Sequence, residues 1–164
     1  MELQALSLVS LWLRQLFYIF NTSPLARIIC IDYGGKRCGL AVTDPFQMIA
    51  TSLITVDTKS LYTFLTDYIS KEPVELILIG EPLNLDASPT HATPLVKKAI
   101  LELTEKFPTI PIQTVDERFS SKTAVRAMIE MGMKKKDRQV KQNVDLIAAT
   151  ILLQEYLNHK DLMP

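Results

Sequence analysis

Residues 28–44, which read IICIDYGGKRCGLAVTD, decide how the rest of the chain is interpreted. Ile28 to Ile31 form a short apolar run, which is typical of a strand buried on both faces. A second strand-like run covers residues 38–43, and Gly34-Gly35 separate the two runs, so the stretch predicts a hairpin. Asp32 interrupts the first run, where an unpaired charge is costly, and glycines let the backbone approach a ligand closely. The stretch indicates a metal or phosphate site; the simpler alternative is a hairpin whose aspartate only caps its turn.

The composition indicates one globular domain of ordinary size. The chain has 164 residues, of which 48% are apolar and 22% charged, and it contains no internal repeat. Cys30 and Cys38 lie across the proposed hairpin rather than in a CxxC pair, which predicts buried thiols in a reducing cytosol. His91 and His159 lack the spacing to complete a zinc site with them.

Charge is segregated along a chain whose net charge is zero. Residues 57–117 contain ten acidic and five basic side chains, and residues 118–141 contain eight basic and two acidic ones. The eight are Arg118, Lys122, Arg126, Lys134, Lys135, Lys136, Arg138 and Lys141. The basic segment is therefore next to the acidic residues that are described below as the best candidates for catalysis.

Residues 1–25 are an apolar extension that precedes the expected domain. The run from Leu3 to Phe20 is interrupted by Arg14-Gln15, lacks a preceding positive charge and is followed by no small-residue cleavage site. Three interpretations remain: a surface amphipathic helix, a membrane-lying anchor, or a leader outside the native protein that results from a start site placed upstream of Leu25. The expected domain covers residues 26–158, with a tail at 159–164.

Hydrophobic periodicity after the hairpin predicts alternating strands and helices. Strands are expected over 48–56, 74–79 and 110–115; helices are expected over 58–70, 93–107, about 120–131 and 143–158; residues 132–141 are expected to form a basic loop. This order predicts an α/β fold, a five-stranded mixed sheet flanked by helices.

Three acidic residues occupy element ends that this topology could bring together. Asp32 ends the first strand, Glu117 follows the fifth, and Asp145 lies in the first turn of the last expected helix, on the face that carries Ala149 and Leu152. No Lys or Arg is expected beside Asp32 or Asp145 on that face, so a divalent cation would relieve their repulsion. Hard oxygen ligands favour Mg²⁺ or Mn²⁺, and a two-metal site could hydrolyse a phosphodiester. Asp116 is expected to point to the opposite face.

The basic residues suit a phosphodiester substrate. Lys134, Lys135, Lys136, Arg138 and Lys141 could neutralise backbone phosphates without reading bases, and Lys36, Arg37 and Arg118 could do so near the metals. The alternatives are a solvated surface loop for the lysines and ordinary caps and turn residues for the three acids. An actin-like ATPase shares the Asp-x-Gly opening, but it needs a second Gly-rich phosphate loop, and this chain has five glycines and no such loop.

Four segments in order resemble the YqgF family, also called RuvX. They are residues 32–44 (DYGGKRCGLAVTD), 80–84 (GEPLN), 116–124 (DERFSSKTA) and 145–154 (DLIAATILLQ). The resemblance runs from Ala26 to about Leu157, and Ala87 stands where the family usually has a glycine.

The resemblance implies an RNase H-like fold and a metal-dependent nuclease whose acidic positions match Asp32, Glu117 and Asp145. It also implies maturation of the 5′ end of pre-16S ribosomal RNA, in ribosome biogenesis in the bacterial cytoplasm. Structured RNA is the expected partner. Resolution of Holliday junctions in branched DNA and a nucleic-acid-binding module without turnover remain as alternatives.

Overall fold

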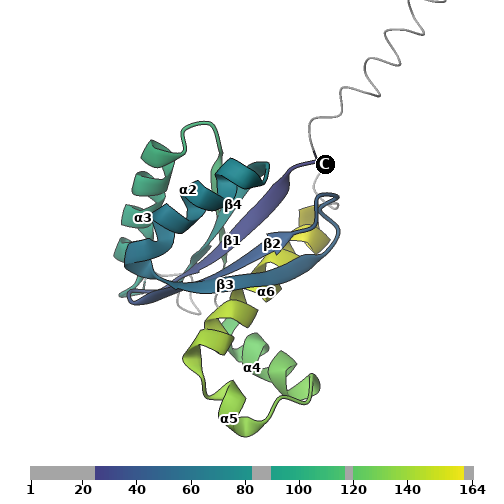
Figure 1. Cartoon of the computed structure of the whole chain (residues 1–164). Helices are drawn as coiled ribbons and strands as arrows, with labels where there is room; N and C mark the ends of the chain where they lie inside the picture. Colours follow the sequence, from purple (N-terminus) through teal and green to yellow (C-terminus); the bar gives the residue numbers. More distant parts are fainter. Residues whose placement is uncertain (1–24, 83–89, 117–119, 161–164) are drawn as a thin grey trace, which may run out of the picture.

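The computed structural model describes residues 25–82, 90–116 and 120–160 of the chain (Figure 1). Apart from η1 and α5, its elements follow the order predicted from the sequence. The strands are β1 (Arg27–Tyr33), β2 (Arg37–Thr43), β3 (Ala50–Asp57), β4 (Val74–Glu81) and β5 (Ile112–Asp116). The helices are η1, a 3-10 turn (Thr58–Ser60), α2 (Leu61–Lys71), α3 (Thr93–Lys106), α4 (Ser120–Glu130), α5 (Lys135–Arg138) and α6 (Lys141–Lys160). Residues 1–24 of the apolar extension and the tail after Lys160 lie outside the described residues.

The five strands form one mixed sheet in the order β3-β2-β1-β4-β5. β1, β2 and β3 pair antiparallel, and β4 and β5 run parallel to β1. Parallel strands need crossover connections, which α2 and α3 supply between β3 and β5. The predicted mixed sheet flanked by helices is confirmed.

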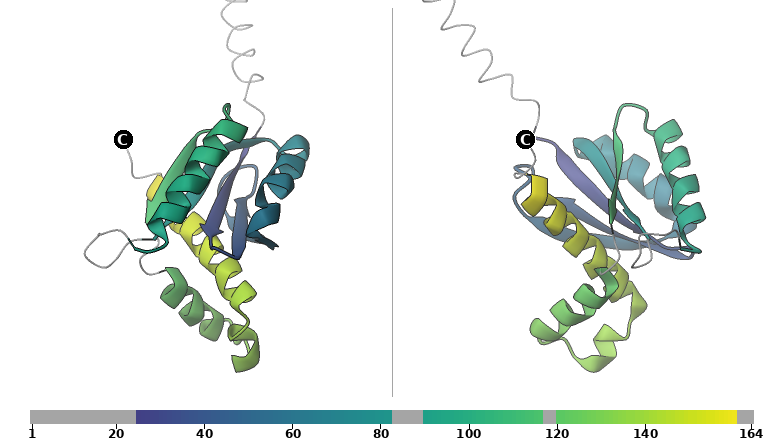
Figure 2. Two further views of the ribbon diagram at one scale, coloured as in Figure 1. Left: turned by 90° about the vertical axis from the view of Figure 1, so that its left-hand side faces the viewer. Right: turned by 180° about the vertical axis from the view of Figure 1, so that it is seen from behind.

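Each face of the sheet buries its own apolar cluster, because alternate residues of a strand point to opposite faces. Ile29 and Ile31 of β1 pack with Leu65 of α2 and Leu103 of α3 on one face. On the other face, Ile28 and Cys30 of β1 pack with residues of α6, among them Ala149 and Leu152. Figure 2 shows α6 crossing the sheet on the side opposite α2 and α3. The even-numbered positions of β1 therefore face α6.

Helices α4 and α5 extend beyond the sheet and form what we call the arm, residues 120–138 (Figures 1 and 2). The arm packs against α6 rather than against the strands. Among the described residues, no helix is long and apolar enough to cross a bilayer. Both cysteines are buried and neither forms a disulfide, as predicted.

Two of the boundaries that differ from the prediction have a clear local reason. The third strand begins at Ala50 rather than Met48, because the Asp44 carboxylate accepts hydrogen bonds from the backbone N–H groups of Phe46, Met48 and Ile49 and holds them in a turn. The next helix begins with η1 rather than with a full α-helical turn. There the Thr58 hydroxyl donates to the Gly34 carbonyl at 2.7 Å, which ties this start to the hairpin.

Candidate active site

Asp32 lies near the end of β1, on the face of the sheet that α6 covers. The alternation that directs Ile28 and Cys30 toward α6 places Asp32 on the same side. In the antiparallel pairing of β1 with β2, Asp32 lies directly opposite Gly39. The position across the ladder from this carboxylate therefore has no side chain.

Gly39 lets α6 approach the sheet closely. A Cβ atom added at Gly39 would collide with the backbone carbonyl of Asp145 in α6. Only glycine permits this contact, because every other residue carries that atom. The register of β1 and β2 and the absence of a side chain at Gly39 together bring Asp145 of the last helix next to Asp32 of the first strand.

The turn between β1 and β2 is fixed by hydrogen bonds to its own backbone and to η1. The Gly34 N–H donates to the Arg37 carbonyl at 3.0 Å, and the Thr58 N–H donates to the Lys36 carbonyl at 3.1 Å. A Cβ atom on Gly34 would lie 2.5 Å from the Arg37 carbonyl oxygen, whereas one on Gly35 would meet only the Leu95 side chain at 3.9 Å. The turn therefore needs its first glycine and holds the two cationic residues at the edge of the site.

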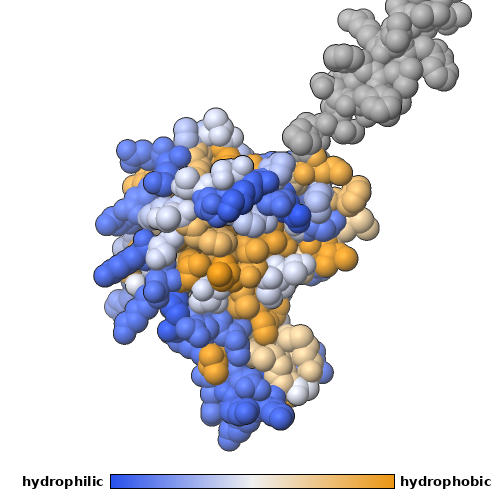
Figure 3. All heavy atoms as spheres, in the orientation of Figure 1, coloured by the Kyte–Doolittle hydropathy of each residue, from blue (hydrophilic) through white to orange (hydrophobic). Residues whose placement is uncertain are grey.

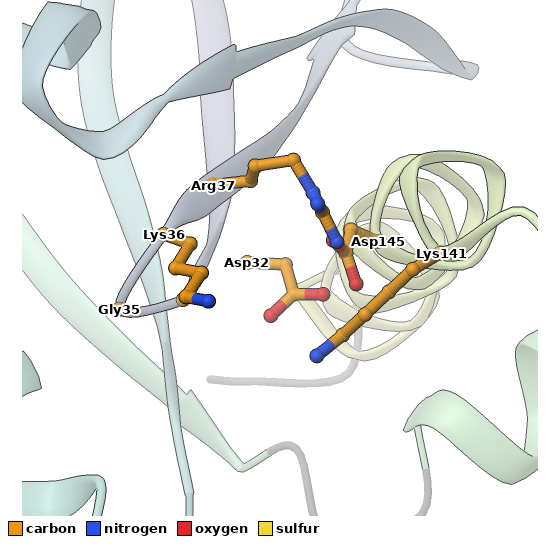
Figure 4. Close-up of a pocket in the computed structure, with 7 residues that line it drawn as sticks. Asp32, Gly35, Lys36, Arg37, Lys141 and Asp145 are labelled. Carbon is orange, nitrogen blue, oxygen red and sulfur yellow. The ribbon is translucent and has the colours of Figure 1, made fainter.

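These elements enclose a pocket of about 390 Å³. It is lined by Asp32, Gly34, Gly35, Lys36, Arg37, Lys141 and Asp145. Figure 4 shows the carboxylates of Asp32 and Asp145 close together, with the Lys141 amine extending toward the same space. The pocket thus combines two acidic side chains with three basic ones.

The expectation that no basic residue adjoins Asp145 was wrong. Arg37 Nε lies 3.6 Å from Asp145 Oδ2, and the two side chains are 27% and 18% exposed. The long arginine side chain reaches across from the start of β2, which residue spacing along α6 does not reveal. Burial raises the pKa of the Asp145 carboxyl above its ordinary value, and the charges of Arg37 and Lys141 oppose that rise only in part.

Asp145 also lies deeper in its helix than predicted. Helix α6 begins at Lys141 rather than Asn143, so Asp145 follows the first turn and lies one turn after Lys141. Residues four apart share a helix face. This places the Lys141 cation on the same side of α6 as the Asp145 carboxylate.

The predicted basic loop at 132–141 is instead folded in part. Lys135–Arg138 form α5, and Lys134 provides the extended residue that precedes it. Lys134, Lys135 and Lys136 are exposed, and the projecting end that α5 forms in Figure 3 is hydrophilic. These lysines and Arg138 do not line the pocket; of the segment, only Lys141 does.

Glu117 and Arg118 lie outside the described residues. Asp116, the last residue of β5, is exposed and pairs with Glu81 in the strand register. Among the described residues, no group of three or more His, Cys, Asp or Glu side chains is placed to hold a metal ion. The two pocket carboxylates still suit a hard divalent cation, which prefers oxygen ligands and tolerates an incomplete protein shell.

Sequence reasoning overlooked Gly39. A signal was available, because a hairpin that turns at residues 34–36 pairs Asp32 with Gly39, and a glycine inside a strand indicates a close approach by another backbone. The same reasoning could have placed the last helix over this position.

A family model described as "RuvX: Holliday junction resolvase" matches residues 26–159 of the chain. The chain belongs to the RuvX family. A protein of Flavobacterium psychrophilum is 47% identical over 136 residues, which are 83% of this chain and 99% of that protein. One of Christiangramia forsetii is 49% identical over 133 residues, which are 81% and 98% of the two chains. Both carry the name "Putative pre-16S rRNA nuclease".

The fold is shared with a solved structure of the fowlpox virus resolvase in complex with Holliday junction DNA. The TM-score is 0.54 at 13% sequence identity, over 84% of this chain and 99% of that one. A likeness at this identity concerns the fold alone, and it agrees with the RNase H-like fold expected from the sequence. With the family established, the chain is a nuclease, a hydrolase that acts on phosphodiester bonds.

Proposed function

We propose that this RuvX-family nuclease is metal-dependent and cleaves structured RNA, in the 5′-end maturation of pre-16S rRNA in the bacterial cytoplasm. The observation that carries the proposal is the convergence of Asp32 and Asp145, from opposite ends of the domain sequence, in one pocket bordered by cations. The relatives' shared name supports the RNA substrate.

Asp32 and Asp145 would hold Mg²⁺ or Mn²⁺, and we propose Glu117 as the third ligand. Val115 of β5 packs on the α6 face of the sheet, and Glu117 follows it two positions later in the sequence. Two bound ions would activate a water molecule and stabilise the leaving oxygen of the phosphodiester. The fit rests on donor chemistry, since carboxylate oxygens are the ligands these ions prefer.

The basic residues divide into two groups with different proposed roles. Lys36, Arg37 and Lys141 border the pocket and would hold the phosphate to be cleaved. Lys134, Lys135, Lys136 and Arg138 belong to the arm, and they would bind backbone phosphates farther along the substrate, with Arg118 as a further phosphate contact. Such contacts carry no sequence information, so they fit RNA and branched DNA equally.

The test compares cleavage of two substrates with and without Mg²⁺: a 16S precursor RNA that retains its 5′ leader, and a four-way DNA junction. We expect metal-dependent cleavage of the RNA and loss of that cleavage in D32N. The matched control is D67N, which removes an exposed carboxylate on α2 that pairs with Lys71 of the same helix. Undiminished cleavage by D32N would contradict the assigned site.

The family model's description favours branched DNA as the second candidate substrate. Cleavage of the junction in preference to the RNA would support that alternative. Binding of either nucleic acid without cleavage in any divalent metal would identify a module without turnover.

A further inference from the structure

The guanidinium of Arg37 is less fully hydrogen-bonded than that of Arg27, which begins the neighbouring strand. Arg27 begins β1, and its Nε donates to Glu72 Oε2 at 2.9 Å while its Nη1 donates to the Thr43 carbonyl at 2.8 Å. Arg37 begins β2, and its Nε is buried without a hydrogen-bond partner among the described residues. Its distance of 3.6 Å from Asp145 Oδ2 exceeds that of an N–H···O hydrogen bond.

At Nε, the contact with Asp145 is therefore a charge pair that is longer than a hydrogen bond. In a mostly buried ion pair, the attraction between the charges offsets the free-energy cost of desolvation only when the geometry is good and hydrogen bonds satisfy the remaining donors. A guanidinium matches a phosphate in a bidentate arrangement, with shorter and stronger charge-assisted bonds. Arg37 borders the pocket in which the proposed function places the phosphate. The phosphate, a better partner for the guanidinium than the Asp145 carboxylate, would therefore lie within reach of Arg37.

We propose that Arg37 exchanges partners during substrate binding. Without substrate, its cation neutralises Asp145 and competes with a divalent metal for that carboxylate. When a nucleic-acid strand enters, Arg37 turns to the phosphate and releases Asp145 to the metal, so that metal and strand each strengthen the binding of the other. This inference rests on the metal site of the proposed function and adds a coupling between its two ligands.

The charges around Asp145 allow this exchange. Asp32 lies on the β1 side of the pocket, Lys141 lies one turn before Asp145 on α6, and Lys36 extends from the turn (Figure 4). Lys141 keeps a positive charge near Asp145 when Arg37 leaves it. The carboxylate therefore does not become an isolated buried charge at any stage of the exchange.

The test measures the affinity of the purified full chain for Mn²⁺ by calorimetry, alone and with a short single-stranded RNA whose linkages are phosphorothioates that resist cleavage. In the wild type we expect the RNA to tighten Mn²⁺ binding about tenfold, within the usual range of coupling between two ligands. In R37Q we expect tighter Mn²⁺ binding without RNA, by about five- to tenfold, and little further gain when RNA is added.

Two variants separate the exchange from simpler effects. R37K keeps the charge, so its Mn²⁺ affinity without RNA should stay near that of the wild type while the gain with RNA shrinks, because lysine lacks the planar fork. K36Q removes one charge from the same turn without touching Asp145, so it should weaken RNA binding but keep the coupling.

Two results would overturn the inference, and they differ in what else they contradict. If R37Q binds Mn²⁺ as the wild type does and keeps the full gain with RNA, the exchange is wrong while the metal site stands. If the wild type binds no Mn²⁺ in either condition, the metal site fails as well. D145N reports on that site directly, because it should lose Mn²⁺ binding whichever residue occupies position 37.

Discussion

The two ends of the β1–β2 hairpin differ in how fully their polar groups are bonded. At the end where β1 starts, Arg27 bonds to Glu72 and to the Thr43 carbonyl, the Thr43 hydroxyl accepts from the Ile28 N–H at 3.0 Å, and Asp44 caps the next turn. At the end where β1 finishes, Arg37 faces Asp145 across 3.6 Å, and its Nε has no hydrogen-bond partner in the part of the chain that the structure describes.

The difference separates a stabilising end of the hairpin from the end that carries the proposed site. A charge that its neighbours satisfy adds to the stability of the fold, while a charge held with spare bonding capacity costs stability and can bind something else. Substitutions at the two ends should therefore have opposite consequences, and four predictions test this, from the largest expected effect to the smallest.

Replacing Asp145 by asparagine should give the largest effect, a loss of about a thousandfold in cleavage, because several kcal/mol of transition-state stabilisation depend on the metal that this carboxylate would hold. The free energy of unfolding should nevertheless rise in metal-free buffer, because burial disfavours the charged carboxyl. Turnover of the precursor RNA and urea denaturation measure the two quantities. A D145N protein that is less stable and still active would invalidate the comparison.

Replacing Gly39 by alanine should damage both stability and activity. The added methyl group must displace the Asp145 backbone, which costs about 1–3 kcal/mol, as overpacking does elsewhere, and moves the carboxylate away from Asp32. The matched control is G35A in the same hairpin, where the new atom would meet only ordinary van der Waals contact and should change stability little. Equal losses of thermal stability in G39A and G35A would refute the claim that the absence of a side chain at Gly39 lets α6 approach the sheet.

Replacing Arg27 by alanine should lower the unfolding free energy by about 1–2 kcal/mol, because two charge-assisted hydrogen bonds are lost from a side chain that is 23% exposed. Cleavage per folded molecule should stay unchanged, since Arg27 lies at the opposite end of the hairpin from the pocket. Denaturation and single-turnover cleavage at a temperature where the variant is folded would check this. Loss of cleavage by folded R27A would show that the two ends are coupled.

The smallest effects concern pH, and the two ends should respond with opposite signs. Backbone hydrogen bonds lower the pKa of Asp44, and the bond from Ile49 has the largest effect. The contribution of Asp44 to the stability of the fold is therefore present at neutral pH and is lost as the pH falls through that lowered pKa. Burial raises the pKa of Asp145, so stability should fall as the pH rises from the ordinary carboxyl value, 3.8, through the raised one.

Unfolding free energies of the wild type, D44N and D145N, measured across the acidic range, would separate these contributions. D44N should remove part of the loss of stability that the wild type shows as the pH falls. D145N should remove the decrease in stability that it shows as the pH rises. Parallel pH profiles for all three proteins would count against the distinction between the two ends.

Much of this arrangement could be predicted from the sequence because it follows from periodicity. The alternation along residues 28–32 assigns Asp32 to one face, and the apolar spacing after Asp145 turns that residue toward the sheet. The link between Asp145 and Arg37 could not be predicted, because it depends on the conformation of a long side chain that crosses from another element. The fold of 135–138 was missed for another reason: a run of charges looks polar whether or not it forms a helical turn.

The pairing of Asp32 with Gly39 has a consequence for how this chain can vary over evolutionary time. Strand neighbours alternate in direction, so lengthening the 34–36 turn by a single residue could shift the ladder and set a bulky side chain beneath α6. A sheet altered in this way could still fold while the two pocket carboxylates were separated. The proposed chemistry would thus depend on the length of this turn as much as on the acids themselves, and insertions should be tolerated at the opposite end of the hairpin far more readily than here.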